Sequence, residues 1–341
     1  MNLQKAESIM EGTATVVKHT GSHYLLAQLP SWRLFPAVLR GKVRLGGSSA
    51  TNPVAVGDRV EFHADGDLLP DGSVPASETA PAAITRILPR RNYIIRKSVN
   101  LSRQAHIIAA NVDHAFIVVT LAFPEVKLPF IDRLLVTCEV YGVKPVIVLN
   151  KIDIVDEFRD DFAPALENFH RIYEGAGYSI LEVSAKTGRG VDELRRLCLE
   201  KSEDGAPGIS LFSGVSGVGK SSLIKAMDPS LNPKTGLISE AHLQGRHTTT
   251  FYEMYPLCGG EGCIIDTPGI RGFGLVDLEP EEISLYFPEM LKAASGCRFT
   301  PCTHTHEPGC AVKVAVDEGT ISRERYASYL GMLEEYTKYR K

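Results

Sequence analysis

One segment of this chain, Gly214-Val-Ser-Gly-Val-Gly-Lys220-Ser221, limits the folds open to it more than any other. It matches the phosphate-binding pattern G-x-x-x-x-G-K-[ST], follows an apolar stretch at residues 209–212 and precedes a helical stretch at 222–227. A strand, a glycine turn and a helix start in that order present backbone N–H groups and the helix dipole to phosphate oxygens. A chance Gly-rich turn ending in Lys-Ser would lack this context. The segment therefore predicts an α/β domain that binds a nucleoside triphosphate.

The residues of this loop have expected roles in binding phosphate and Mg²⁺. Lys220 would neutralise β- and γ-phosphate oxygens and take part in catalysis, and the Ser221 hydroxyl would ligate Mg²⁺. We expect the phosphate-binding residues to be Gly214, Val215, Ser216, Gly217, Val218, Gly219, Lys220, Ser221 and Ser222.

The segment Asn150-Lys151-Ile-Asp153 suits recognition of guanine. It closes an apolar stretch at residues 146–149, and ligands of α/β sheets bind at the carboxyl ends of strands. The Asp153 carboxylate can accept the ring N–H and the exocyclic amine of guanine, a pair that adenine does not offer. We expect Asn150 to tie this loop to the phosphate loop and the Lys151 stem to cover the purine. Alone, such a segment is usually a polar strand exit.

A second segment of this kind, Ser184-Ala185-Lys186-Thr-Gly, strengthens the guanine interpretation. It follows the next apolar stretch, at residues 180–183, and its backbone N–H groups would donate to the guanine carbonyl. Two base motifs at successive strand ends, together with a phosphate loop, predict binding of GTP and GDP.

The segment Asp266-Thr-Pro-Gly269 also follows a short apolar strand. Asp266 would hold Mg²⁺ through water, and the Gly269 N–H would contact the γ-phosphate. A simple turn is the alternative for this segment taken alone. Residues 245–250, Gly-Arg-His-Thr-Thr-Thr, precede it in a polar stretch long enough to be a switch loop. We expect Thr249 to complete the Mg²⁺ shell, with Thr248 and Thr250 as alternatives.

The residue that orients the attacking water is less evident. Many GTPases carry Gln directly after Asp-x-x-Gly, but this chain has Ile270, so intrinsic hydrolysis should be slow. His247 is the nearest group whose neutral imidazole can accept a proton from water. An exposed loop histidine is the alternative, and Arg246 could instead supply charge to the transition state. The predicted catalytic residues are His247, Lys220 and Thr249.

The order of these motifs is itself informative. Ordinary GTPases place the base motifs after the phosphate motifs, whereas Asn150 and Ser184 precede Gly214 and Asp266 here. This order predicts a circularly permuted GTPase domain, which can keep the same spatial contacts because chain termini often lie close together. The switch after Asp266 then leads directly into the C-terminal region, so loss of the γ-phosphate could reposition that region.

The last cysteines form a metal-binding pattern, Cys297-x₄-Cys302-x-His304-x₅-Cys310. Three thiolates and one imidazole form a closed set suited to one structural Zn²⁺ ion. His306 is a competing fourth ligand, and a buried reduced cluster is the alternative.

Length and patterning predict several domains. The 341 residues exceed a single ordinary core. Short alternating segments over residues 13–62 predict a small β-barrel, closing near 84–88, with residues 63–83 as a long mobile loop too polar and broken to pack. Beyond residue 111, apolar runs alternate with amphipathic stretches, which predicts a parallel sheet with helices on both faces. The chain beyond 278 should be helical.

The basic segment at residues 86–97 has two interpretations. Arg86, Arg90, Arg91, Arg96 and Lys97 flank Tyr93, which makes this segment the best local candidate for an RNA-backbone contact. A basic connector between domains is an equally good explanation. The net charge of −4 excludes a uniformly basic nucleic-acid coat, so any RNA contact must be local. No apolar run approaches the ~20 residues that span a bilayer, and the start lacks secretory-signal features. We expect a soluble cytoplasmic monomer with no membrane partner.

Together these residues resemble the bacterial small-ribosomal-subunit-dependent GTPases of the RsgA family, also called YjeQ. The resemblance covers nearly the whole chain and is carried by residues 56–60, 89–92, 150–153, 214–222, 247–250, 266–271 and the cysteine cluster with 307–310. It implies an OB-fold barrel, a circularly permuted P-loop GTPase domain and a zinc-binding helical domain, which we place at 1–90, 91–278 and 279–341. It also implies GTP hydrolysis stimulated by the small ribosomal subunit, late in its maturation, through rRNA binding. The alternatives are a scaffold that uses GTP only as a switch, and a permuted GTPase acting on the large subunit.

Overall fold

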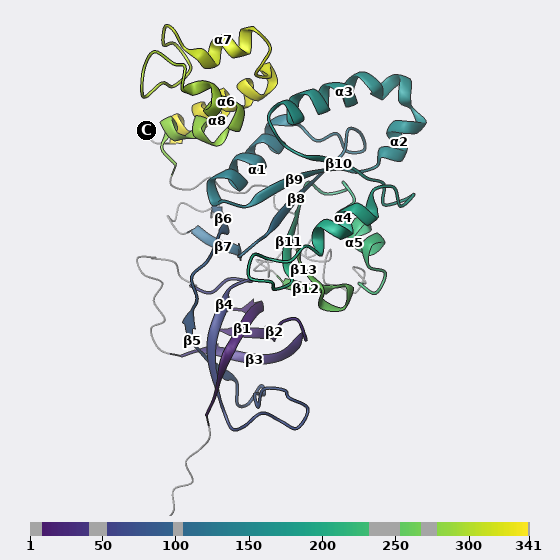
Figure 1. Cartoon of the computed structure of the whole chain (residues 1–341), viewed down its shortest axis with the longest axis vertical. Coiled ribbons are helices and arrows are strands. Elements are labelled where there is room, and N and C mark those ends of the chain that lie inside the picture. Colours follow the sequence, from purple (N-terminus) through teal and green to yellow (C-terminus); the bar gives the residue numbers. More distant parts are fainter. Residues whose placement is uncertain (1–8, 41–52, 98–104, 232–252, 267–277, 340–341) are drawn as a thin grey trace, which may run out of the picture. The chain divides into compact units, whose positions relative to one another are not determined.

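The computed structural model describes residues 9–40, 53–97, 105–231, 253–266 and 278–339 (Figure 1). The chain divides into two compact units. The first comprises Met1–Asp113, Arg196–Leu211 and Pro233–Pro268, and the second comprises His114–Arg195, Phe212–Asn232 and Gly269–Lys341. Both units draw on distant parts of the sequence.

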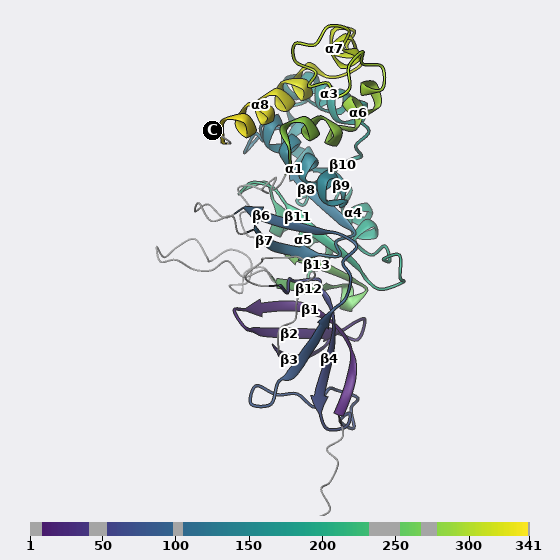
Figure 2. The same cartoon turned by 90° about the vertical axis from the view of Figure 1, so that its left-hand side faces the viewer.

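The first unit contains a closed five-stranded β-barrel (Figure 2). Its strands are β1 (Ile9–Thr20), β2 (His23–Gln28), β3 (Arg33–Leu39), β4 (Arg59–Asp65) and β5 (Ala82–Ile87). They pair in the order β1-β2-β3-β5-β4, with β3 and β5 parallel, and β4 also pairs with β1 to close the barrel. This five-stranded arrangement is that of an OB-like barrel. The predicted barrel is therefore confirmed.

Alternation of apolar and polar residues along these strands fills the barrel interior. The buried side chains include Val16, Leu26, Phe35, Phe62 and Ile84. Because successive strand residues point to opposite faces, every second residue can enter one core while its neighbours meet solvent.

The connection between β4 and β5 corrects the prediction that residues 63–83 do not pack. Val74 is only 4% exposed and belongs to the barrel core, and the Arg33 guanidinium donates a hydrogen bond of 2.7 Å to the Gly72 carbonyl. The expectation was wrong because a single apolar residue in a polar segment is enough to anchor that segment to a core.

Further strands complete the first unit. They are β6 (Tyr93–Lys97), β7 (Ala105–Ala110), β11 (Gly208–Ser213), whose last two residues belong to the second unit, β12 (Glu253–Leu257) and β13 (Gly262–Asp266), with a short 3₁₀ turn, η2 (Cys258–Gly260). Strands β6 and β7 form an antiparallel hairpin, and β12 pairs antiparallel with both β13 and the barrel strand β1 (Figures 1 and 2). Neither the hairpin nor β12 is evident from hydrophobic patterning.

Two arginines of the basic segment, Arg90 and Arg91, join parts of this unit. Arg90 donates to both carboxylate oxygens of Asp58 at 2.6 Å, and the two side chains are 9% and 0% exposed. The Arg91 guanidinium lies 2.9 Å from the Asp113 carboxylate. Arg90 is thus committed to a buried pair and cannot face an RNA backbone, which favours the connector interpretation for these two arginines.

The second unit holds the predicted parallel sheet. Its strands β8 (His114–Val119), β9 (Lys144–Leu149) and β10 (Ile180–Glu182) run parallel in the order β10-β9-β8. Its helices are α1 (Leu128–Tyr141), α2 (Ile152–Glu157), α3 (Arg159–Gly175), α4 (Val191–Cys198), whose last three residues belong to the first unit, and α5 (Lys220–Met227). All of β8 is buried, as expected for a strand covered on both faces. The predicted alternation of strands and helices is confirmed.

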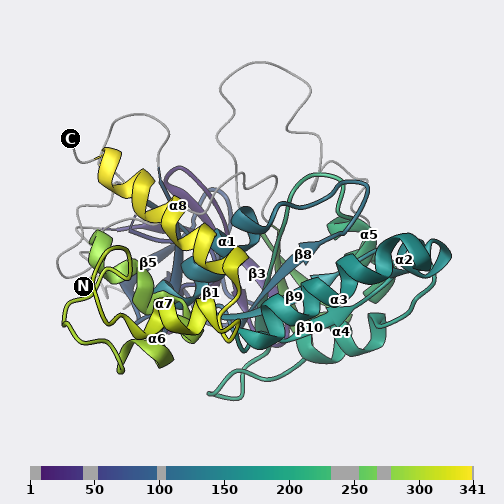
Figure 3. The ribbon, with the colours of Figure 1, turned by 90° about the horizontal axis from the view of Figure 1, so that it is seen from above.

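Helices from the end of the chain share one hydrophobic core with α1 in this unit. They are η3 (Pro280–Tyr286), α6 (Pro288–Ala294), α7 (Ala311–Asp317) and α8 (Arg323–Tyr339), and Figure 3 shows α8 beside α1. Their core includes Val136 of α1. Arg325 is fully buried between these elements, 2.8 Å from the Asp132 carboxylate and 2.7 Å from that of Glu289. This buried pairing ties the terminal helices to α1.

Candidate functional site

The phosphate loop lies between β11 and α5, and two of its glycines are required by close contacts. A Cβ on Gly214 would lie 2.3 Å from the Val118 carbonyl oxygen, and one on Gly219 would lie 2.3 Å from Asn150 Nδ2. Gly214 and Gly219 also have φ angles of 148° and 99°. No side chain fits at either position without moving the neighbouring strand ends.

Lys220 begins α5 and folds back over the loop. Its Nζ donates to the carbonyl oxygens of Gly214, at 2.7 Å, and Val215, at 3.1 Å. The first turn of α5 contains no acidic residue, so nothing there offsets the positive end of the helix dipole. An ammonium group and an uncompensated helix start therefore converge on the loop, which suits a phosphate group. Ser221 and Ser222 occupy the same helical turn.

Asn150 connects three motifs that are distant in sequence. Its side chain is buried, its Nδ2 donates to the Val218 carbonyl at 2.7 Å, and its Oδ1 accepts from the Ala185 N–H at 3.2 Å. Both ends of one amide are thus used, one on the phosphate loop and one on the Ser184 segment. This is the connection expected for Asn150, with the second base motif as an additional partner.

Lys151 also binds the phosphate loop, with its backbone in the left-handed region at φ 64°. Its Nζ donates to the Gly217 carbonyl at 2.8 Å and to the carbonyl of Phe123. These contacts hold the lysine stem across the space between the base motif and the loop. The sequence contained no signal for Phe123 or for Pro124, which lies against Gly217.

Asp153 lies in the first turn of α2 with its carboxylate oriented by the second base motif. The Ser184 hydroxyl donates to Asp153 Oδ1 at 2.6 Å, and Lys186 Nζ lies 3.8 Å from Oδ2. The Asp153 side chain is 15% exposed, so it is shielded but still accessible to a ligand. An ionised carboxylate held in this way can accept the two N–H groups that guanine presents side by side.

Several predicted residues lie outside the described part of the chain. His247 and Thr249 fall in residues 232–252, and Gly269 falls in residues 267–277. The backbone of Asp266 is described and forms the last residue of β13. The roles expected for these four residues stay predictions.

The predicted zinc ligands form one compact cluster. The ligand atoms of Cys297, Cys302, His304 and Cys310 all lie within 4.8 Å of one another. Cys297 Sγ is 3.9 Å from Cys310 Sγ, and His304 Nδ1 is 3.4 Å from Cys310 Sγ. Tetrahedral Zn²⁺ with Zn–S bonds of about 2.3 Å places its sulfur ligands ~3.8 Å apart, so the donor set fits this ion.

The loop around the cluster is held by hydrogen bonds from α8. The hydroxyls of Tyr326 and Tyr329 donate to the carbonyls of His304 and Thr303, each at 2.6 Å. Burial lowers the pKa of His304, which favours the neutral imidazole that a metal ligand requires. His306 is exposed and is not part of the cluster.

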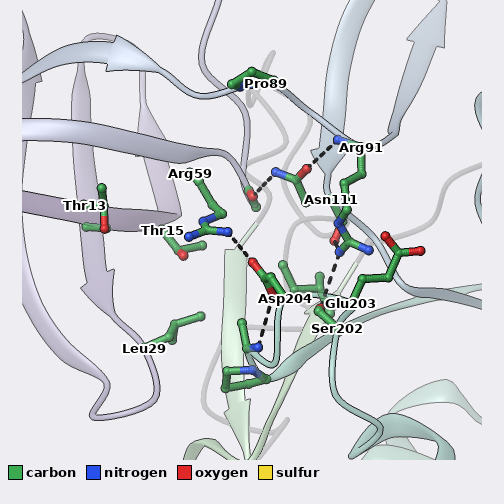
Figure 4. Close-up of a pocket in the computed structure, with 15 residues that line it drawn as sticks. Thr13, Thr15, Leu29, Arg59, Pro89, Arg91, Asn111, Ser202, Glu203 and Asp204 are labelled. Atoms are coloured by element: carbon green, nitrogen blue, oxygen red, sulfur yellow. Dashed lines mark hydrogen bonds and ion pairs between the residues drawn. The ribbon is translucent and has the colours of Figure 1, made fainter.

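A cavity of about 400 Å³ lies elsewhere, in the first unit (Figure 4). It is bordered by Thr13 and Thr15 of β1. Among its charged residues, Arg59 pairs with Asp204, and Arg91 pairs with Asp113 and donates to the Ser202 hydroxyl. Its described lining contains no residue of the phosphate loop or the base motifs. The candidate nucleotide site is therefore separate from this cavity.

Comparison with known proteins gives a consistent picture. The family model of the RsgA GTPase matches residues 87–276. A protein of Flavobacterium johnsoniae named small ribosomal subunit biogenesis GTPase RsgA is 45% identical over 94% of this chain and 93% of its own length. A Bacteroides fragilis protein of the same name is 46% identical over 95% of this chain and 98% of its own.

Solved structures agree with these sequence matches. YjeQ from Thermotoga maritima is 33% identical with a TM-score of 0.71, and the match covers 96% of this chain and 99% of that one. YloQ, described as a circularly permuted GTPase, is 25% identical with a TM-score of 0.68, covering 100% and 99%. No helix among the described residues is long and apolar enough to cross a membrane. The permuted motif order, the convergent loops and the extent of these matches together show that this chain belongs to the RsgA GTPase family.

Proposed function

We propose that this protein hydrolyses GTP when stimulated by the small ribosomal subunit and acts as a late maturation factor of that subunit. The observation that carries the nucleotide part is the Asn150 amide, which joins the phosphate loop to the second base motif. The relatives named for small-subunit biogenesis support the ribosomal part. We place the protein in the cytoplasm as a monomer, with rRNA contacted through the barrel.

Each motif then has a defined role in the reaction. The Asp153 carboxylate selects guanine, while Lys220 and the start of α5 hold the phosphates. Mg²⁺ supplies charge neutralisation when bound, and Ser221, Thr249 and, through water, Asp266 are its proposed ligands. His247 orients the attacking water, and the Gly269 N–H contacts the γ-phosphate. Residues 1–90, 91–278 and 279–341 form the three proposed domains.

One structural zinc ion is proposed for the terminal helical region. Cys297, Cys302, His304 and Cys310 would close its coordination shell, which leaves no position for substrate. The ion would stabilise the loop that α8 supports and would not take part in hydrolysis.

The decisive experiment measures GTP turnover by the protein alone, with small subunits and with large subunits. We expect multiple-turnover phosphate release to rise only with small subunits. A single turnover per protein molecule would indicate a scaffold that uses GTP as a switch. Stimulation by large subunits alone would contradict the proposal and favour the other class of permuted GTPase.

A further inference from the structure

Three residues on adjacent strands form a row that leads from the barrel to the nucleotide motifs. Lys18 of β1 lies directly opposite Glu253 of β12, and Glu253 lies directly opposite Asp266 of β13. Directly opposed residues in antiparallel strands have Cα atoms about 4.5–5.5 Å apart. The barrel backbone at Lys18 is thus only ~10 Å from that of Asp266, the proposed Mg²⁺-side residue.

The first step of this row is also joined by side chains. Lys18 Nζ lies 3.0 Å from Glu253 Oε2, and the Tyr255 hydroxyl donates to the same oxygen at 3.1 Å. Both charged side chains are partly shielded, at 33% and 23% exposure. The Glu253 carboxylate is therefore held from the barrel and from its own strand at once.

The barrel backbone is irregular at this point. The pairing of β1 with β2 shifts register between Val16 and Lys18, so Val17 is an extra residue in β1. Such bulges bend a strand and redirect the side chains that follow. Here the bulge immediately precedes the lysine that contacts β12.

Lys18 also borders a cavity on the barrel surface. The cavity, of about 340 Å³, is lined by Lys18, His19 and His23 together with Tyr24 and Glu78. A ligand in this cavity would contact the residue that holds Glu253. Lys18 thus lies between the barrel surface and strand β12, which begins three residues after the last switch threonine, Thr250.

We infer that Glu253, held by Lys18, is a positioning residue for GTP hydrolysis that couples the barrel to Asp266. The inference rests on the proposed function, because it assigns Asp266 to the Mg²⁺ side of the nucleotide. Movement of β1 shifts β12 and, through direct pairing, the end of β13. The same coupling acts in reverse, so the bound nucleotide affects the barrel strand.

A charge-swap series tests the pair in the full-length protein. Glu253→Gln and Lys18→Met should each lower small-subunit-stimulated kcat roughly fivefold or more, with KM for GTP and GDP affinity nearly unchanged. The double variant Lys18→Glu/Glu253→Lys should recover most of the loss, because it restores opposite charges at the same register. Arg196→Met removes the exposed pair between Arg196 and Glu200 at the end of α4, outside the proposed nucleotide and rRNA contacts, and serves as the matched control. Surface ion pairs add little to folding stability, so the variants should remain folded.

Hydrogen exchange tests the same coupling without ribosomes. In the wild-type protein, exchange of the β1 amides at residues 15–20 should differ between the GDP form and the form with a non-hydrolysable GTP analogue. Glu253→Gln should remove this difference, and Arg196→Met should keep it. Equal β1 exchange in both nucleotide forms of the wild type, or an unaltered difference in Glu253→Gln, would overturn the inference. Failure of small subunits to stimulate the wild type would instead count against the proposed function, and the exchange result would still decide the coupling.

Discussion

The side-chain amide of Asn150 donates a hydrogen bond of 2.7 Å to the carbonyl oxygen of Val218, which is 68 residues later in the chain. The bond joins the end of β9 to the phosphate loop, and the other end of the same amide accepts from Ala185. One buried side chain therefore sets the spacing between the groups proposed to read the base and those proposed to hold the phosphates. Circular permutation leaves this contact intact, because it depends on where strands end in space and not on their order.

Replacing Asn150 with Ala should weaken GTP and GDP binding alike. The change removes two buried hydrogen bonds and leaves the Val218 carbonyl unpaired, at a cost of about 1–3 kcal/mol for the unpaired group. We expect a roughly 10- to 100-fold rise in Kd for both nucleotides by calorimetry. Unchanged affinity with an unchanged melting temperature would show that the two loops are positioned without this amide.

Asp153→Asn should change base selectivity more than phosphate binding. The new amide can still accept from the Ser184 hydroxyl, but it would present N–H donors where guanine also presents donors. Affinity for GTP should fall roughly 10²-fold or more, while affinity for xanthosine triphosphate, which carries a carbonyl in place of the amine, should rise. Competition binding with the two nucleotides measures this change in selectivity. Equal losses for both would argue against a direct contact between Asp153 and the base.

Gly219→Ala should abolish tight nucleotide binding because the added methyl would meet Asn150 Nδ2 at 2.3 Å. Gly177→Ala is the matched control: Gly177 has a similar φ of 95°, but a Cβ there meets nothing within 4 Å. Both variants carry a similar backbone cost of ~1 kcal/mol. A difference in GDP affinity between them therefore reports what is specific to Gly219, its close approach to Asn150 within the phosphate loop, and equal affinities would refute it.

Cys310→Ser should release the metal and loosen the terminal helices. Cys310 is both a cluster member and a buried residue of the core that joins these helices to α1. We expect about one zinc per wild-type chain by elemental analysis, clearly less in the variant, and a melting temperature lower by at least ~5 °C. His306→Ala, at an exposed position beside the cluster, should keep both values. Loss of zinc from His306→Ala would instead identify His306 as the fourth ligand.

His247→Ala should lower stimulated GTP turnover by roughly 10²-fold while GTP affinity stays near normal. The reason is that a group orienting water contributes to the transition state and little to ground-state binding. Single-turnover kinetics with small subunits measures the chemical step. Full activity in this variant would show that another group orients the attacking water. Arg246→Ala would then be the next variant to measure.

The phosphate loop, the base motifs and the zinc ligands could be predicted from the residues alone. Each of these depends on residue types at short spacing. A glycine pattern before Lys220, a carboxylate at a strand end or thiols around His304 carry their function locally, and the strands and helices that flank them have clear hydrophobic periods. The permuted order of the motifs could also be predicted, because motif order is a property of the chain itself.

The partners of the remaining groups are known only from the fold. In the sequence, Arg90 and Arg91 are typical of a nucleic-acid contact, but in the fold they pair with Asp58 and Asp113. Val74 looks like part of a polar loop until the barrel closes over it. The row from Lys18 through Glu253 to Asp266 joins segments more than two hundred residues apart. Charge pairing, core packing and strand register depend on which distant groups meet. A single sequence does not show which distant residues become neighbours.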